Sequence, residues 1–125
     1  MLSDQMLIEL GAQVIADEEY DGHDWEGIAL VIQIEPRQRL FGYMYLPGGD
    51  WTVACPALDG VLDKALALAE AMRADGRGAW KACLLRISRA GMRLAVEFEA
   101  EDPARWNITP GNLSQRVEEL RPLIP

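Results

Sequence analysis

The sequence predicts a single α+β domain, residues 1–125, in which an antiparallel sheet of about five strands packs against helices. Apolar residues recur with a helical period near both ends and in the middle of the chain, and they alternate with a strand period in between. The strands form two groups of consecutive segments joined by short turns, a pattern typical of antiparallel pairing. We therefore expect the order α-β-β-β-α-β-β-α, with the helices covering one face of the sheet.

The first helix is predicted over residues 4–15, with Ser3 or Asp4 as its N-terminal cap. Its apolar stripe consists of Met6, Leu7, Leu10 and Val14. The turn-rich residues 17–24 end this helix. Residues 25–35 then alternate with a period of two, and both sides of the alternation are largely apolar. They are predicted to form a strand that ends at Pro36, because proline cannot donate to a ladder.

Two further strands and the longest helix follow. Residues 40–46 and 51–55 are predicted strands, separated by the turn-forming residues 47–50. A second helix begins after Pro56 and is closed by Gly76 and Gly78. Its stripe consists of Leu58, Val61, Leu62, Ala65, Leu68, Ala69 and Met72.

The last third of the chain is predicted to form a hairpin, a loop and a short helix. Residues 80–87 and 92–99 are the two strands, joined by a turn at residues 89–91. In the second strand we expect Met92, Leu94, Val96 and Phe98 to face the core and Arg93, Glu97 and Glu99 to face water. After the loop at 101–112, Asn112 is the expected cap of a helix that Pro122 ends. Its apolar face holds Leu113, Val117 and Leu120.

The charge is distributed unevenly along the chain. The net charge is −8 and the isoelectric point about 4.6, which argue against nucleic acid and against anionic membranes as partners. Residues 1–36 contain nine acids and no lysine or arginine, whereas the remaining residues have a net charge of +1. A basic protein is the partner that such a distribution would attract.

The sequence also predicts a cytoplasmic location. It has no apolar run long enough to cross a membrane, and its N-terminus lacks the basic region of a signal peptide. Cys55 and Cys83 are then expected to be buried thiols, not a disulfide. No cofactor or metal is expected.

No pattern in the sequence predicts catalysis. The single histidine, His23, lies in a turn-rich acidic segment without further nitrogen or sulfur ligands near it in sequence. Glu97 and Glu99, followed by Glu101 and Asp102, have the spacing of paired catalytic or ion-binding acids. The same spacing arises on any water-facing strand, and a third interpretation is contact with another protein. The motifs of serine hydrolases, phosphate-binding loops, dinucleotide folds and dithiol sites are missing.

Two features are candidates for protein binding. One is the acidic segment, defined here as residues 17–26, which is either a solvated turn or a docking surface for a cationic partner. The other is tryptophan, because indoles either pack at sheet edges or anchor interfaces. Among the tryptophans at 25, 51, 80 and 106, Trp106 is the best candidate for an anchor because it lies in a loop beside Arg105.

The element order, together with several short motifs, resembles the YezG-like immunity proteins of bacterial polymorphic toxin and contact-dependent growth inhibition systems. The motifs are Trp25-x-x-Ile28, Phe41-Gly-Tyr-Met-Tyr45, Trp80 after the long helix, and Glu97-Phe98-Glu99 followed by Asp102-Pro103-x-Arg105-Trp106. The resemblance implies a small cytoplasmic protein that binds and blocks a toxin domain, in many systems a nuclease, and that has no catalytic residues. The segment from Asn107 to Pro110 departs from the pattern.

A second class fits the element order and charge. Class I type III secretion chaperones are small, acidic and similar in layout, and they dimerise around an unfolded effector segment. An enzyme remains a third class, which would need a metal or cofactor that the sequence does not indicate.

We therefore predict an immunity protein, not an enzyme, that covers a basic surface of its cognate toxin. The predicted partner-binding residues are Asp17, Glu18, Glu19, Asp21, Asp24, Glu26, Glu97, Glu99, Glu101, Asp102 and Trp106. The oligomeric state is left open.

Overall fold

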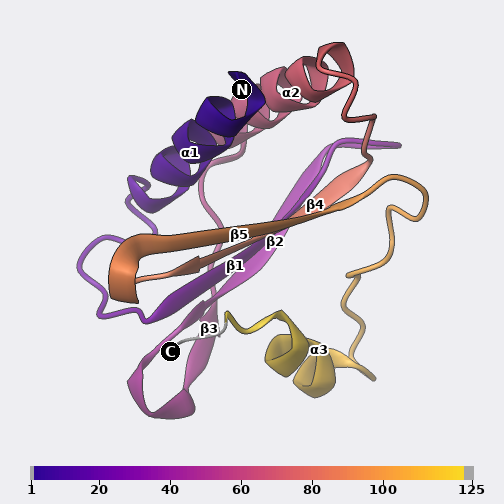
Figure 1. The fold of residues 1–125 in the computed structure, drawn as a ribbon. Helices are drawn as coiled ribbons and strands as arrows, with labels where there is room; N and C mark the ends of the chain where they lie inside the picture. The colour runs from indigo at the N-terminus through magenta and orange to yellow at the C-terminus, as the bar shows by residue number, and fades with distance from the viewer. Residues whose placement is uncertain (1, 123–125) are drawn as a thin grey trace.

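The computed structural model describes residues 2–122 and confirms the predicted fold class and element order. Five strands form one antiparallel sheet, accompanied by three helices (Figure 1). In chain order the elements are α1 (Leu2–Ile15), β1 (Gly27–Gln33), β2 (Arg39–Tyr45), β3 (Trp51–Val53), α2 (Leu58–Ala74), β4 (Ala82–Ser88), β5 (Arg93–Glu99) and α3 (Leu113–Leu120).

The sheet has the strand order β3-β2-β1-β4-β5, so β1 is central and β3 and β5 are the edges. Gly27 pairs with Tyr45 on one side and Ser88 on the other, and Ser88 pairs in turn with Arg93. These four residues therefore mark one end of the sheet. Gln33, Ala82 and Glu99 mark the opposite end, six residue steps or about 20 Å away along the strands.

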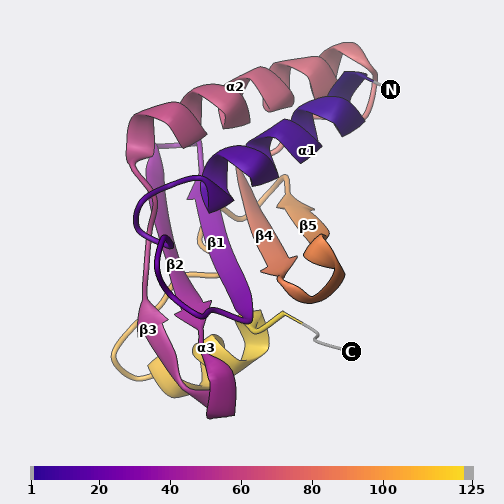
Figure 2. The same ribbon diagram turned by 90° about the vertical axis from the view of Figure 1, so that its left-hand side faces the viewer.

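One face of the sheet is covered by α1 and α2 (Figure 2). The even-numbered residues of β1 point to this face and are fully buried with the apolar stripes of both helices. The core between the layers includes Leu10, Val14, Ile28, Leu30, Ile32, Val61, Ala65, Leu68, Met72, Cys83, Leu85 and Ile87. Burying this apolar surface is the main favourable term in folding.

The other face is covered by α3 and the loop before it, so the expectation that all helices share one face is wrong for α3 (Figure 1). A second core there contains Ala29, Val31, Tyr43, Tyr45, Ala82, Leu84, Trp106, Val117 and Leu120. The Tyr45 hydroxyl donates a hydrogen bond of 2.6 Å to the Val117 carbonyl and fixes α3 to the sheet. The apolar second side of β1 requires this cover, because a strand buried on both faces carries apolar residues at every position.

Three local expectations are also wrong. α1 begins at Leu2, so Asp4 lies in its first turn and pairs with Arg77 at 2.9 Å instead of capping the helix. Met92 belongs to the turn before β5, with a φ of 45° and 54% of its surface exposed. The Asn112 side chain accepts a hydrogen bond from the Thr109 backbone, so it fixes the loop and leaves the α3 N–H groups uncapped.

Candidate partner-binding surface

The acidic segment joins α1 to β1 at the end of the sheet where β1 begins. Five of its six carboxylates belong to exposed residues: Glu18, Glu19, Asp21, Asp24 and Glu26. Between residues 2 and 122, none of these five carboxylates makes a hydrogen bond or an ion pair. No basic side chain therefore pairs with these carboxylates to offset their mutual repulsion. In water this repulsion is modest.

The backbone of the segment is held firmly beneath these charges. Tyr20 and Trp25 are 2% and 5% exposed and belong to the core under α1 and α2. The Arg89 guanidinium stacks on the Trp25 ring at 4.1 Å and donates to the His23 carbonyl at 3.2 Å. The segment thus presents carboxylates from a backbone that packing fixes in place, which lowers the entropy lost on binding.

Asp17 has a different role from the other five acids. Its carboxylate accepts hydrogen bonds of 2.9 Å from the backbone N–H groups of Glu19 and Ala57. Ala57 immediately precedes α2, so this one side chain ties the exit of α1 to the start of α2. Asp17 is half-buried and its acceptor capacity is used within the chain. It is a structural residue within the predicted surface.

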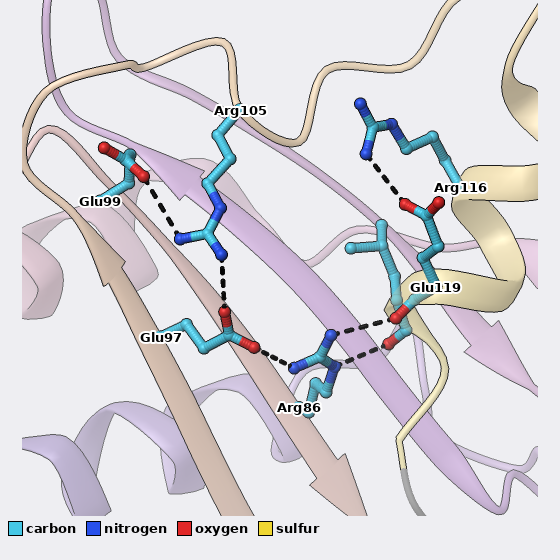
Figure 3. A network of polar contacts seen from close by, with 7 residues as sticks. Arg86, Glu97, Glu99, Arg105, Arg116 and Glu119 are labelled. Carbon is cyan, nitrogen blue, oxygen red and sulfur yellow. Dashed lines mark hydrogen bonds and ion pairs between the residues drawn. The ribbon is translucent and has the colours of Figure 1, made fainter.

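Glu97 and Glu99 belong to a ladder of ion pairs on the α3 side of the sheet (Figure 3). Arg86 contacts Glu97 at 2.6 Å, and Arg105 contacts Glu97 at 3.2 Å and Glu99 at 3.3 Å. The expectation that both acids face water is wrong for Glu99, whose side chain is 18% exposed, whereas the Glu97 side chain remains 42% exposed. Both carboxylates are paired with arginines, so neither is a free charge.

Glu99 also fixes the start of the loop before α3. One of its carboxylate oxygens accepts hydrogen bonds from the backbone N–H groups of Glu101 and Asp102. These bonds, more than the neighbouring Arg105, lower the pKa of Glu99. The Asp102 carboxylate accepts from the Ala104 N–H at 2.9 Å, whereas Glu101 is exposed and only its backbone is engaged.

The predicted acidic residues do not form one surface. Glu26 precedes Gly27 at one end of the sheet, and Glu99 lies at the opposite end of β5. The two acidic regions are therefore separated by about the length of a strand, roughly 20 Å. One flat partner surface can therefore contact either residues 18–26 or the region around Glu101, but not both. Residues 18–26 hold more acidic side chains than the region around Glu101.

Trp106 lies in the second core and is 6% exposed, with Arg105 stacked over its ring at 4.8 Å. Its indole holds the loop before α3 against the sheet, so it is not available as an exposed anchor. The tryptophans at 25 and 80 are buried in the first core.

Sequence reasoning missed Arg86, the one charged residue inside the buried strand β4. Its guanidinium donates to the Leu120 and Glu119 carbonyls as well as to Glu97, so it binds the C-terminal end of α3 (Figure 3). A cation is favourable there because the last carbonyls of a helix lack intrahelical partners. The available signal was an arginine in the otherwise apolar run of residues 82–87.

The part of the chain that the structure describes holds no group of three or more histidine, cysteine, aspartate or glutamate side chains placed to bind a metal. Cys55 and Cys83 are free thiols, the first half-buried and the second buried. Within residues 2–122 no helix has the length and apolarity needed to cross a membrane.

Comparison with protein-family models and with curated proteins gives no match for this chain.

Proposed function

We propose that this chain is a cytoplasmic immunity protein that binds a cognate toxin domain through the acidic segment and covers a basic surface of that toxin. The observation that carries the proposal is the set of five exposed carboxylates on a backbone fixed by Tyr20, Trp25 and Asp17. The resemblance to YezG-like immunity proteins supports the same function. In this proposal the chain acts by binding and not by catalysis.

The physical case rests on carboxylates that form no ion pair with other described residues. The nearby cations are engaged elsewhere, Arg89 on the Trp25 ring and Arg121 with Glu118. A basic partner brings cations to the five carboxylates and converts their repulsion into attraction. The resulting field also accelerates the encounter, since complementary charges steer association. A nuclease fits this role because its substrate site must be basic to bind phosphate.

The proposal is tested by neutralising the segment while keeping Asp17. The variant combines Glu18→Gln, Glu19→Gln, Asp21→Asn, Asp24→Asn and Glu26→Gln. The binding partner is the product of the adjacent gene, obtained by co-purification. We expect the association rate to fall roughly tenfold or more at low salt and its salt dependence to flatten.

A matched control removes the same total charge elsewhere on the surface. Glu9, Glu35, Asp59, Asp63 and Asp75 are exposed and make no ion pair with other described residues. Their Gln or Asn variants should leave most of the association rate intact. An equal loss of association rate in both variants would show that net charge, and not a local docking site, controls binding. An unchanged association rate in the first variant would show that the acidic segment is not a docking site.

The stoichiometry of the purified complex separates this function from that of a secretion chaperone. An immunity protein should bind one toxin domain per chain. Two chains around one extended effector segment would instead favour the class I type III secretion chaperone. Protection of cells that express the toxin provides an independent readout of immunity.

A further inference from the structure

The two edges of the sheet differ in length and in cover. β3 has three residues, whereas β5 has seven, from Arg93 to Glu99. Among the described residues β5 pairs only with β4, so its other side is a free edge of the sheet, which Figure 2 shows at the side away from β3. Such an edge presents unpaired N–H and C=O groups that can form a ladder with another strand.

An apolar groove of about 380 Å³ lies next to this edge, between α1 and the start of β5. Its walls include Ile8 and Ala12 of α1 together with Met92 and Leu94. Ile8 and Met92 are 59% and 54% exposed and line the same groove, so they form an apolar patch and are not exposed singly. Because Leu94 belongs to both features, the edge and the groove form one continuous surface.

We propose that a second copy of this chain pairs with β5, antiparallel and about a two-fold axis at Val96, to give one continuous ten-stranded sheet. This register aligns all seven residues of both strands. It places Arg93 opposite Glu99 of the second copy, Leu94 opposite Phe98, and Ala95 opposite Glu97. Val96 meets its own symmetry mate. The interface is isologous, as in most homodimers.

Charge complementarity favours this register and this partner. Arg93 is exposed and makes no ion pair within residues 2–122. Across the axis it meets Glu99 of the second copy, whose carboxylate also contacts Arg105, so each pairing adds a second cation to a glutamate that already has one. Shifting the axis to Glu97 would place like charges opposite each other, and shifting it to Ala95 would pair fewer residues of the strand. Opposite charges across an antiparallel pair stabilise it, and like charges destabilise it.

The apolar contacts lie on the α1 side of the joined sheet. Leu94, Val96 and Phe98 all pack toward the core under α1 and α2, so their cross-strand contacts extend that core across the axis. α1 lies over the edge, since a Cβ on Gly11 would be 3.2 Å from the Leu94 side chain. The two Leu94 positions are four residue steps apart along the strands, about 13 Å, which leaves room for both helices.

The first test is the molar mass of the full chain in solution, measured by light scattering over a concentration series. We expect a species of twice the 13.9 kDa chain mass. Arg93→Glu should raise the dissociation constant of the dimer roughly tenfold, because two attractive pairs become repulsive. The control is Arg37→Glu, which makes the same charge change at an exposed residue without an ion pair among the described residues.

The second test fixes the register by covalent cross-linking. Val96→Cys places two thiols directly opposite each other, with Cα atoms about 4.5–5.5 Å apart, which suits a disulfide. Mild oxidation should link this variant into dimers. Val53→Cys, on the β3 edge and 68% exposed in the native chain, should not cross-link. The unmodified chain controls for Cys55 and Cys83.

A monomeric mass at every concentration overturns the proposal and leaves the edge to a strand from a different protein. A dimer that is insensitive to Arg93→Glu and is not cross-linked through residue 96 also overturns it. The inference does not rest on the function proposed above, because the acidic segment is not part of this edge. A dimeric immunity protein would bind two toxin domains, one per chain, whereas a dimeric chaperone would bind one effector segment.

Discussion

Asp17 shows how one side chain within a charged segment can serve structure while its neighbours remain free. Its two carboxylate oxygens each accept a backbone N–H, one from Glu19 and one from Ala57, 40 residues away. Replacement by alanine would leave both donors without this acceptor.

We predict that Asp17→Ala lowers the free energy of unfolding by roughly 1–2 kcal/mol, as the loss of a helix-capping side chain does. Asp21→Ala is the control, because Asp21 is exposed and its carboxylate makes no hydrogen bond with the described residues. Urea denaturation of the three proteins measures both effects. Equal stability of the two variants would show that the bond to Ala57 does not form in solution.

Arg86 and Glu99 illustrate what residue-level reasoning from the sequence can and cannot supply. Alternation along β5 correctly places Glu97 and Glu99 on the face opposite Leu94 and Val96. It does not reveal that this face is partly covered, because α3 is distant from β5 in the chain and Arg105 reaches the face from the loop that follows β5. Solvent exposure of a strand face is a tertiary property.

At the scale of elements, β1 and β2 approach each other closely at Gly42. A Cβ built on this residue would lie 2.2 Å from the Ala29 carbonyl oxygen, a backbone atom that cannot move without disturbing the central strand. Both strands are buried at this point. Only glycine is compatible with this contact.

We predict that Gly42→Ala lowers the free energy of unfolding by roughly 3 kcal/mol or more, through strain in the central strands. Gly60→Ala is the matched control in α2, where the added Cβ would meet only the flexible tip of Gln13. That change should be neutral or should stabilise the chain by up to about 1 kcal/mol, since alanine favours helix. Thermal or urea unfolding distinguishes the two, and similar stabilities would contradict the close approach.

The elements themselves could be predicted from the sequence because their periods are clear. The stripe of α2 and the alternation of β1 predict their structures, with ends displaced by one or two residues. The position of α3 does not follow from the pattern of α3 itself. The signal for it lies in the strands, where Ala29, Val31, Tyr43 and Tyr45 form an apolar second face of the sheet that needs a cover.

At the scale of the whole molecule, the charge asymmetry of the sequence becomes an asymmetry in space. The acids at 18–26 cluster at the end of the sheet where β1 begins, whereas Glu97 and Glu99 lie toward the other end and are paired. The sequence could predict the first region because its residues are consecutive. The sequence could not show that Glu97 and Glu99 lie far from this first region, because the strand register decides which residues lie at the same end of the sheet.

The buried cysteine thiol and tyrosine hydroxyls of the two cores make the free energy of unfolding depend on pH. Burial raises the pKa of the Cys83 thiol from its ordinary value of 9.0 to about 12. Burial also raises the pKa values of the Tyr20 and Tyr45 hydroxyls. Above pH 9 the unfolded chain therefore loses protons that the folded chain retains. The folded state is then penalised progressively, because the ionised form is accessible only on unfolding.

We predict that the free energy of unfolding falls as pH rises from about 9 toward 12, and that Cys83→Ala makes this fall shallower by up to about 1.4 kcal/mol per pH unit. The variant will be less stable at neutral pH, because the smaller side chain leaves a cavity, so the quantity to compare is the slope and not the absolute value. Urea denaturation at closely spaced pH values between 8 and 10.5 provides that slope. Cys55→Ala should have a smaller effect, since the Cys55 thiol is only half-buried and its pKa is raised less. Parallel curves for the wild type and Cys83→Ala over this range would mean that solvent reaches the thiol at position 83. In that case α1 and α2 would pack less tightly on the sheet than the burial of Cys83 with Ile32 and Leu85 indicates.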